Sequence, residues 1–268
     1  MSREQLEGRW ALVLGASSGF GAATSRALAG AGMNIFGVHL DPRSRLPRAQ
    51  EVMDDIEATG SQAVFFNTNA ASARKRGRVL DQIEEVLADD PADGVHFMLH
   101  SLAFGSLLPF VAEEPDEAVN ESQMEMTLRV MAHTLVYWVQ DLVRRDLLLH
   151  GSRVYALSSE GAERMAPNYG AVSAAKAALE SHMRQLTLEL GSHGIAVNCL
   201  RPGVTDTPAL RAIPGHEAYM EEALRRNPSG RLTTPQDVAT TLVVLADPEL
   251  TWISGAVIPV DGGETIVG

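Results

Sequence analysis

The chain has 268 residues, of which 45% are hydrophobic, and a formal net charge of −12. This length is enough to bury one full core, and the strongly acidic balance argues against a nucleic-acid partner. The single cysteine, Cys199, excludes an internal disulfide framework, and there is neither a signal-peptide pattern nor an apolar run long enough for a membrane span, so we expect a cytoplasmic protein.

Apolar runs and amphipathic stretches alternate along the whole chain. Strands are predicted near residues 10–14, 34–38, 62–67, 94–100, 151–158, 194–200 and 255–260. Helices are predicted near residues 19–31, 44–59, 73–89, 116–149, 167–192, 208–227 and 235–246. This alternation predicts an α/β fold, a single Rossmann-like domain over residues 1–268 with a doubly wound parallel sheet of seven strands and helices on both faces.

The first predicted strand leads into a glycine-rich turn and then into an alanine-rich helix. Glycine lets the backbone turn sharply and approach a pyrophosphate, and the helix N-terminus offers N–H groups and a positive dipole end. The pattern therefore predicts a dinucleotide site. Its predicted contacts are Gly15, Ser17, Ser18, Gly19, Phe20 and Gly21.

Tyr169 and Lys176 lie seven residues apart in the stretch NYGAVSAAK. On a helix this spacing places both side chains on one face, where a nearby ammonium lowers the phenol pKa from roughly 10. The pair therefore suggests a proton donor, although two residues can also share a helix surface by chance. Ser159 precedes them, and it either donates a second hydrogen bond to the substrate or merely caps the end of a strand.

These motifs together resemble the short-chain dehydrogenase/reductase family, over about residues 8 to 263. Asn69-Ala70 resembles the family's adenine-side Asp-Val, and the stretch from Arg201 to Thr207 resembles its Pro-Gly nicotinamide loop. The resemblance implies that Ser159, Tyr169 and Lys176 are catalytic. It also implies cofactor contacts from Asn69, Ala70, Ser101, Leu102, Ala103, Lys176, Gly203, Val204, Thr205 and Thr207.

The cofactor preference depends on the end of the second strand. Enzymes that use NAD usually place an acidic residue there to bind the ribose hydroxyls. By resemblance that position falls near Val38 or His39, and Asp41 comes later. Arg43 and Arg45 could embrace a 2′-phosphate. We therefore expect NADPH rather than NADH, with contacts from His39 and Arg43, while Asp41 is the residue that argues for NADH.

The position of the tyrosine points to one branch of the family. Most members place the tyrosine four residues before the lysine, which here is Val172. The stretches His100–Gly105 and Gly161–Tyr169 resemble the His-Ser-Ile-Gly-Phe-Ala and Gly-Ala-Glu-Arg-x-x-Pro-Asn-Tyr motifs of enoyl-acyl-carrier-protein reductases. Ser159 stands where many of these carry a second tyrosine, which is closest to their third bacterial type. The resemblance implies reduction of the C=C bond of a trans-2-enoyl thioester, as in fatty acid biosynthesis.

Two alternatives to enoyl reduction remain open. The first is a carbonyl reductase or alcohol dehydrogenase that acts on a ketone or 3-oxoacyl substrate through Ser159 and Tyr169. Many such members hold a proton-relay water with an asparagine at a position that is Met131 here, which weakens this alternative. The second is a nucleotide-bound regulatory protein with little catalysis, against which the intact tyrosine–lysine pair argues.

The partners follow from the same resemblance. We expect an acyl thioester on acyl carrier protein or coenzyme A, no metal, and a homotetramer formed through the helices near 116–149 and 167–192. Residues 207–228, rich in proline and glycine, are interpreted as a mobile lid over the substrate, with a rigid surface excursion as the alternative. Arg225, Arg226 and Arg231 near this lid either offer a basic patch to an acidic carrier or form a solvated helix end.

Overall fold

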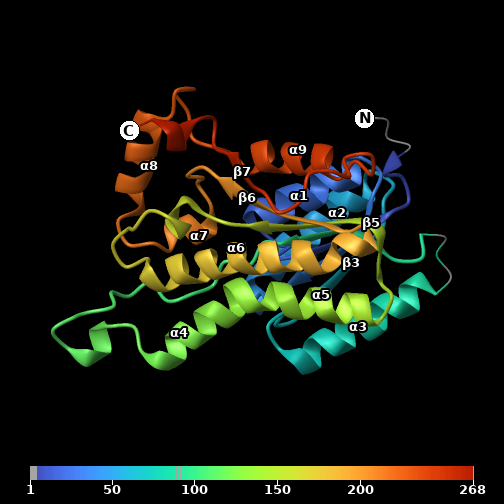
Figure 1. Ribbon diagram of the computed structural model, residues 1–268, viewed down its shortest axis with the longest axis horizontal. Helices are drawn as coiled ribbons and strands as arrows, with labels where there is room; N and C mark the ends of the chain where they lie inside the picture. Colours follow the sequence, from blue (N-terminus) through green and yellow to red (C-terminus); the bar gives the residue numbers. More distant parts are fainter. Residues whose placement is uncertain (1–4, 89, 91, 268) are drawn as a thin grey trace.

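The computed structural model describes residues 5–88, 90 and 92–267, and its centre is a seven-stranded sheet in the order β3-β2-β1-β4-β5-β6-β7 (Figure 1). All neighbouring strands run parallel. The strands are β1 (Trp10–Leu14), β2 (Asn34–His39), β3 (Ala63–Asn67), β4 (Val95–His100), β5 (Leu148–Leu157), β6 (Ala196–Pro202) and β7 (Val257–Val260). The predicted doubly wound parallel sheet is confirmed.

Helices cover both faces of this sheet (Figure 1). The α-helices are α1 (Gly19–Gly30), α2 (Leu46–Glu57), α3 (Ala73–Leu87), α4 (Glu121–Leu128), α5 (Thr134–Arg144), α6 (Gly170–Leu190), α7 (Pro208–Arg211), α8 (His216–Arg226) and α9 (Pro235–Leu245). Among the residues that the structure describes, no helix combines the length and the apolar character needed to cross a bilayer.

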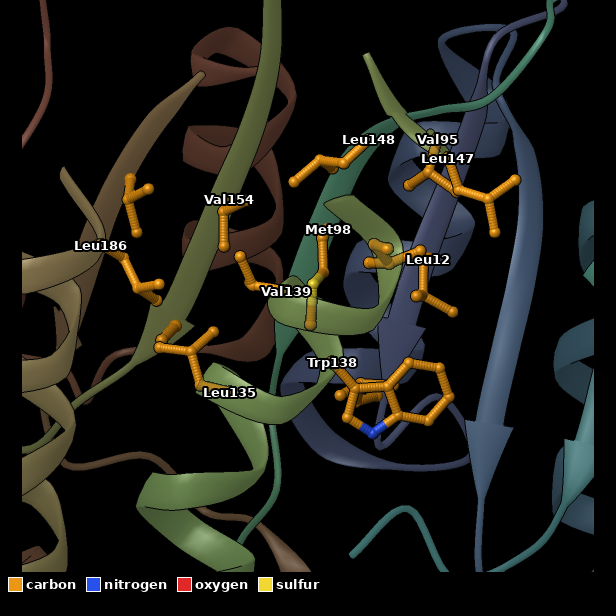
Figure 2. Close-up of a cluster of buried hydrophobic side chains, with 14 of the residues drawn as sticks. Leu12, Val95, Met98, Leu135, Trp138, Val139, Leu147, Leu148, Val154 and Leu186 are labelled. Carbon is orange, nitrogen blue, oxygen red and sulfur yellow. The ribbon is translucent and has the colours of Figure 1, made fainter. Parts of the chain in front are cut away.

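Two apolar cores lie on opposite faces of the sheet because successive strand residues point to opposite sides. Trp10, Leu12 and Leu14 of β1 pack toward α3, α5 and α6, and part of this core is drawn in Figure 2. Ala11 and Val13 of the same strand pack toward α1, α2 and α9. Strand β1 is buried along its whole length, so the glycine turn that follows it starts from a fixed point.

The helix expected over residues 116–149 is wrong as a single element. It is a one-turn 3₁₀ helix (Pro115–Glu117), then α4, a π-helical turn (Arg129–His133) and α5. Asn120 starts α4 by accepting a hydrogen bond from the Gln123 N–H in a capping box. Asp146 adopts a positive φ of 55° just after α5, and β5 then begins at Leu148 rather than at residue 151.

Two further boundaries differ from the prediction, and both affect the site. The helix expected over 208–227 is divided into α7, which ends at Arg211, and α8, which begins at His216 after Gly215 takes a φ of +74°. The helix expected from residue 167 begins only at Gly170, so Tyr169 is the residue before α6 rather than a residue within it.

Candidate active site

The carboxyl ends of β1 and β4 bring two of the predicted cofactor segments together. Gly15 has a φ of +94°, and a side chain there would run into the backbone carbonyl of Ser101. The Ser101 N–H donates to the carbonyl of Leu14 at 2.9 Å. Only glycine permits this approach. The glycine turn and the start of the Ser101–Ala103 segment are therefore neighbours, at the point where ligands bind to open parallel sheets.

The N-terminus of α1 faces this crevice with its N–H groups uncapped by a side chain. Ser18 is the N-cap in an extended conformation, and its hydroxyl makes no cap hydrogen bond to the described part of the chain. The Thr207 side chain lies 3.7 Å from the position that a Cβ on Gly19 would occupy, so the nicotinamide-loop segment reaches the same turn. This donor set fits a pyrophosphate, which favours a helix N-terminus.

At the end of β2, Asp41 and Arg43, the residues that would select NADH and NADPH respectively, have different surroundings. His39 is buried, and its Nδ1 lies 2.9 Å from Asp41 Oδ2. Asn67 at the end of β3 holds the Asp41 backbone through two hydrogen bonds of 3.0 Å. Arg43 lies in an exposed 3₁₀ turn (Arg43–Arg45). His39 thus supports the Asp41 carboxylate, and Arg43 faces solvent beside it.

Ser159 and Tyr169, ten residues apart, meet beyond the end of β5. The Tyr169 hydroxyl donates to Ser159 Oγ at 3.5 Å, which is a long hydrogen bond. The same Oγ accepts from the Gly161 N–H at 3.1 Å, and Ser159 caps the 3₁₀ turn Glu160–Ala162. Ser159 is therefore a cap, and because both acceptor positions of its hydroxyl are used, its O–H remains available as a donor.

Lys176 is buried within α6. Lysine rarely lies inside a protein without a partner. Its Nζ donates to the carbonyl of Leu157 at 2.6 Å, two residues before Ser159. Burial lowers the pKa of Lys176 to about 8. The lysine thus ties helix α6 to the end of β5, directly behind the Ser159–Tyr169 pair.

The expected lowering of the Tyr169 pKa by Lys176 is wrong in this structure. Burial raises the pKa of the phenol, and the hydrogen bond with Ser159 is what opposes this rise. The physical reason is local geometry, since Tyr169 precedes α6 and the ammonium is directed to Leu157 instead. At neutral pH the tyrosine is therefore a protonated hydrogen-bond donor.

The remaining predicted cofactor residues are partly occupied by contacts of their own. The carbonyl of Ala70 accepts from Trp138 Nε1 at 3.0 Å, and the Val204 N–H donates to Glu264 at 3.2 Å. Asn69 Oδ1 accepts from the Ala71 N–H at 2.9 Å. Thr205 donates to the carbonyl of Gly203, and Thr207 caps α7. These contacts fix the loops, so the groups left for a cofactor are fewer than the resemblance implied.

Glu180 escaped the sequence reasoning, whereas His100 was named there as the start of the His100–Gly105 stretch. Glu180 is buried one turn after Lys176 on α6, and it accepts from Ser158 Oγ at 2.5 Å and from Arg201 at 3.1 Å. The spacing of four from Lys176 was a usable signal, because such residues share a helix face. His100 at the end of β4 is fully buried, where burial and then the nearby Lys176 lower its pKa to about 3.

The three arginines expected to offer a basic patch are each paired with a carboxylate. Arg225 binds Glu222 at 2.7 Å, and Arg231 binds Asp237 at 2.7 Å. Arg226 binds Glu160 at 3.2 Å. Their charges are largely compensated locally, which weakens the interpretation of this region as a patch for an acidic carrier.

Comparison with known proteins agrees with this arrangement. A family model described as enoyl-(acyl carrier protein) reductase matches residues 15–265. This chain belongs to the short-chain dehydrogenase/reductase family. It is accordingly an NAD(P)-dependent oxidoreductase.

Similar proteins within the family differ in the reactions that their names describe. The NADH-dependent enoyl-[acyl-carrier-protein] reductase FabI of Aquifex aeolicus is 31% identical over 64% of this chain and 62% of that protein. Versicolorin reductase stcU of Emericella nidulans is 27% identical over 97% of this chain and 96% of that protein. A short chain dehydrogenase of Burkholderia cenocepacia in complex with NADP is 26% identical, with a TM-score of 0.81 and coverage of 97% and 99%. Both cofactors therefore occur among its relatives.

Proposed function

We propose that this protein reduces the C=C bond of a trans-2-enoyl thioester with NADPH. The observation behind this proposal is the position of Tyr169, which stands one turn before the residue that would be the usual donor, Val172. Val172 is buried against Met131 and Ala175 and has no polar atom to offer. The match to the enoyl-(acyl carrier protein) reductase model is consistent with it.

The position of a donor decides which oxygen it can serve. In ketone reduction, hydride adds to the carbon that bears the oxygen. In enoyl reduction it adds to Cβ, and negative charge develops on the thioester oxygen at the far end of the conjugated system. A donor for that oxygen stands farther from the hydride source, and one helical turn displaces a side chain by about 5 Å. In this proposal Tyr169, three residues before Val172, takes the more distant position.

Each residue of the centre has a distinct task in this proposal. The nicotinamide cofactor supplies the hydride when it is bound. Tyr169, protonated at neutral pH, donates to the developing enolate oxygen, and the O–H of Ser159 is placed to donate to the same atom. Lys176 holds the end of β5 and binds the ribose hydroxyls. Solvent delivers the proton to Cα, so that one hydride on Cβ and one proton on Cα complete the saturated thioester.

Reduction of a 3-oxoacyl thioester or another ketone is the second candidate. The 3.5 Å contact between Tyr169 and Ser159 favours it, because a serine and a tyrosine that converge on one point can also bind a carbonyl oxygen. The similarity to versicolorin reductase over nearly the full length points the same way.

A direct comparison of two substrates distinguishes the candidates. Purified enzyme is incubated with NADPH and either crotonyl-coenzyme A or acetoacetyl-coenzyme A, and the decrease in absorbance at the nicotinamide band is followed. We expect turnover of the crotonyl thioester. Turnover of the acetoacetyl thioester alone would instead establish the ketone-reducing reaction.

A further inference from the structure

Arg226, at the end of α8, joins three segments that are far apart in the chain. Its two terminal nitrogens each lie 3.2 Å from one oxygen of Glu160, which is a fork-like, charge-assisted contact. One of the same nitrogens lies 3.5 Å from Glu264 in the C-terminal 3₁₀ turn (Glu264–Ile266). The Arg226 side chain is only 13% exposed, so water screens these contacts weakly.

The two carboxylates belong to different segments of the candidate centre, and one nitrogen of Arg226 contacts both. Glu160 directly follows Ser159, whose Oγ contacts the Tyr169 hydroxyl. Glu264 is fully buried and accepts the Val204 N–H at 3.2 Å, in the loop proposed to receive the nicotinamide. A buried carboxylate is costly without a cationic partner, and Arg226 is an ion-pair partner of Glu264. One guanidinium therefore connects the donor side and the cofactor side.

Helix α8 buries little apolar surface against the body of the protein, and besides Arg226 its end is held by its C-cap Asn227, which donates to the carbonyl of Asp261 at 2.9 Å. Of its residues, all of which the structure describes, Ala223 alone is buried. Tyr219 adds a long hydrogen bond of 3.5 Å to the carbonyl of Pro167, whereas Arg225 pairs with Glu222 inside the helix. Figure 1 shows α8 at the end of the molecule where the strands finish, beside the C-terminal segment. Segments with so little buried apolar surface open at low cost.

Arg164 provides a second, more exposed link within the same cluster. It binds Glu160 at 2.8 Å and donates to the carbonyl of Thr265 at 3.3 Å. This arginine ties the Ser159 turn to the C-terminal turn without involving α8. Arg164 therefore already connects the Ser159 turn with the C-terminal turn, and Arg226 connects α8 to both of them.

We propose that Arg226 is a positioning residue that couples closure of α7 and α8 to the alignment of the catalytic centre. With α8 closed, the guanidinium fixes Glu160 and covers Glu264, so the Ser159 turn and the Val204 loop are held together. With α8 open, both carboxylates lose this partner and both segments loosen. The proposal depends on the reductase function of the Ser159–Tyr169–Lys176 centre, but not on which double bond is reduced.

The test compares Arg226→Gln with Arg225→Gln, its exposed neighbour, and with Glu160→Gln. We expect Arg226→Gln to lower kcat at least 10-fold at saturating NADPH and substrate, with Arg225→Gln within 2-fold of wild type. The double variant Glu160→Gln/Arg226→Gln should lose less than the product of the two single losses, because both substitutions remove the Arg226–Glu160 contact. Arg226→Lys should recover little, since an ammonium cannot form the fork. Unchanged kcat in Arg226→Gln, or multiplied losses in the double variant, would overturn the proposal.

Amide hydrogen exchange provides a readout that needs no turnover. Arg226→Gln should increase exchange over residues 159–164 and 203–206 as well as in α8, whereas Arg225→Gln should change neither of the first two segments. An increase in exchange that is confined to α8 in Arg226→Gln would contradict the proposed coupling. If wild-type enzyme reduces acetoacetyl- rather than crotonyl-coenzyme A, the proposed reaction fails, and the same variants are scored on the substrate that is turned over.

Discussion

Gly161 lies against the aromatic ring of Tyr169, so closely that a methyl group on Gly161 would overlap the ring carbons Cε1 and Cδ1. Gly161 is also the residue whose N–H binds Ser159 Oγ at 3.1 Å. One glycine therefore sets the positions of both proposed donors, from the 3₁₀ turn that follows β5.

The substitution Gly161→Ala tests this placement. The added methyl group must push the Tyr169 ring aside, and a displacement of about 1 Å can cost roughly 100-fold in rate. We expect kcat to fall by about 10- to 100-fold while affinity for NADPH, measured by nicotinamide fluorescence, stays near the wild-type value. Gly77→Ala on α3, where nothing lies within 4 Å of the new Cβ, is the matched control and should leave kcat unchanged. A fully active Gly161→Ala enzyme would show that the ring's position is unimportant.

Removal of the phenol oxygen tests the donor itself. Tyr169→Phe should lower kcat by about 10²- to 10³-fold, the usual range for loss of one hydrogen-bond donor to a developing oxyanion. Ser159→Ala should lower kcat less, because Tyr169 still donates a hydrogen bond to the enolate oxygen in that variant. Tyr137→Phe, on an exposed tyrosine of α5, controls for loss of a hydroxyl elsewhere. Full turnover by Tyr169→Phe with crotonyl-coenzyme A would rule out the proposed role.

His100 should make the protein sensitive to mild acid. Its folded-state pKa of about 3 lies below the ordinary value of 6.5, so below pH 6.5 the unfolded chain takes up a proton that the folded chain refuses. The stability contribution is complete above pH 6.5 and falls by about 1.4 kcal/mol per pH unit toward pH 3.

Urea unfolding at pH 7.5 and 5.5 measures this effect. His100→Leu should lose about 1 kcal/mol less stability between the two pH values than wild type does, because the titrating group is gone. His193→Gln, at an exposed position, should keep the wild-type dependence. Equal acid sensitivity in wild type and His100→Leu would mean that another group dominates.

The cofactor preference predicts opposite effects for Arg43 and Asp41. If the 2′-phosphate of NADPH binds Arg43, Arg43→Ala should weaken NADPH binding about 10- to 100-fold, the range for a hydrogen bond to a charged group, and leave NADH binding unchanged. Arg48→Ala, an exposed arginine on α2, is the control. Tighter binding of NADH than NADPH, together with its loss in Asp41→Ala, would instead assign NADH.

Much of the fold could be read from the sequence because it rests on regular patterns. Fully buried strands such as β1 and the glycine turn at Gly15 have strong local signals. The break at Gly215 was not predicted although Pro214-Gly215 is a turn signal, and the positive φ of Asp146 was not predicted either. Helix boundaries depend on single residues, and so the start of α6 one residue after Tyr169 was not foreseen.

The site was predictable only in part for a different reason. Tyr169 and Lys176 could be named from their spacing and Ser159 from the resemblance to the family, and the structure brings Ser159 and Tyr169 within 3.5 Å. The direction of the Tyr169 pKa shift could not be predicted from the sequence, because it depends on burial and on the hydrogen bond from Lys176 to Leu157. The contacts of Arg226 with Glu160 and Glu264 join residues up to 66 positions apart, and sequence spacing contains no information about them.

The most direct test of enoyl reduction follows the hydride itself. Enzyme is given equimolar crotonyl- and acetoacetyl-coenzyme A with NADPH that carries deuterium at both C4 positions, and the products are examined by mass spectrometry and NMR. We predict butyryl-coenzyme A with one deuterium on C3. Deuterium on the carbinol carbon of 3-hydroxybutyryl-coenzyme A, with the crotonyl thioester recovered unchanged, would contradict the proposed function.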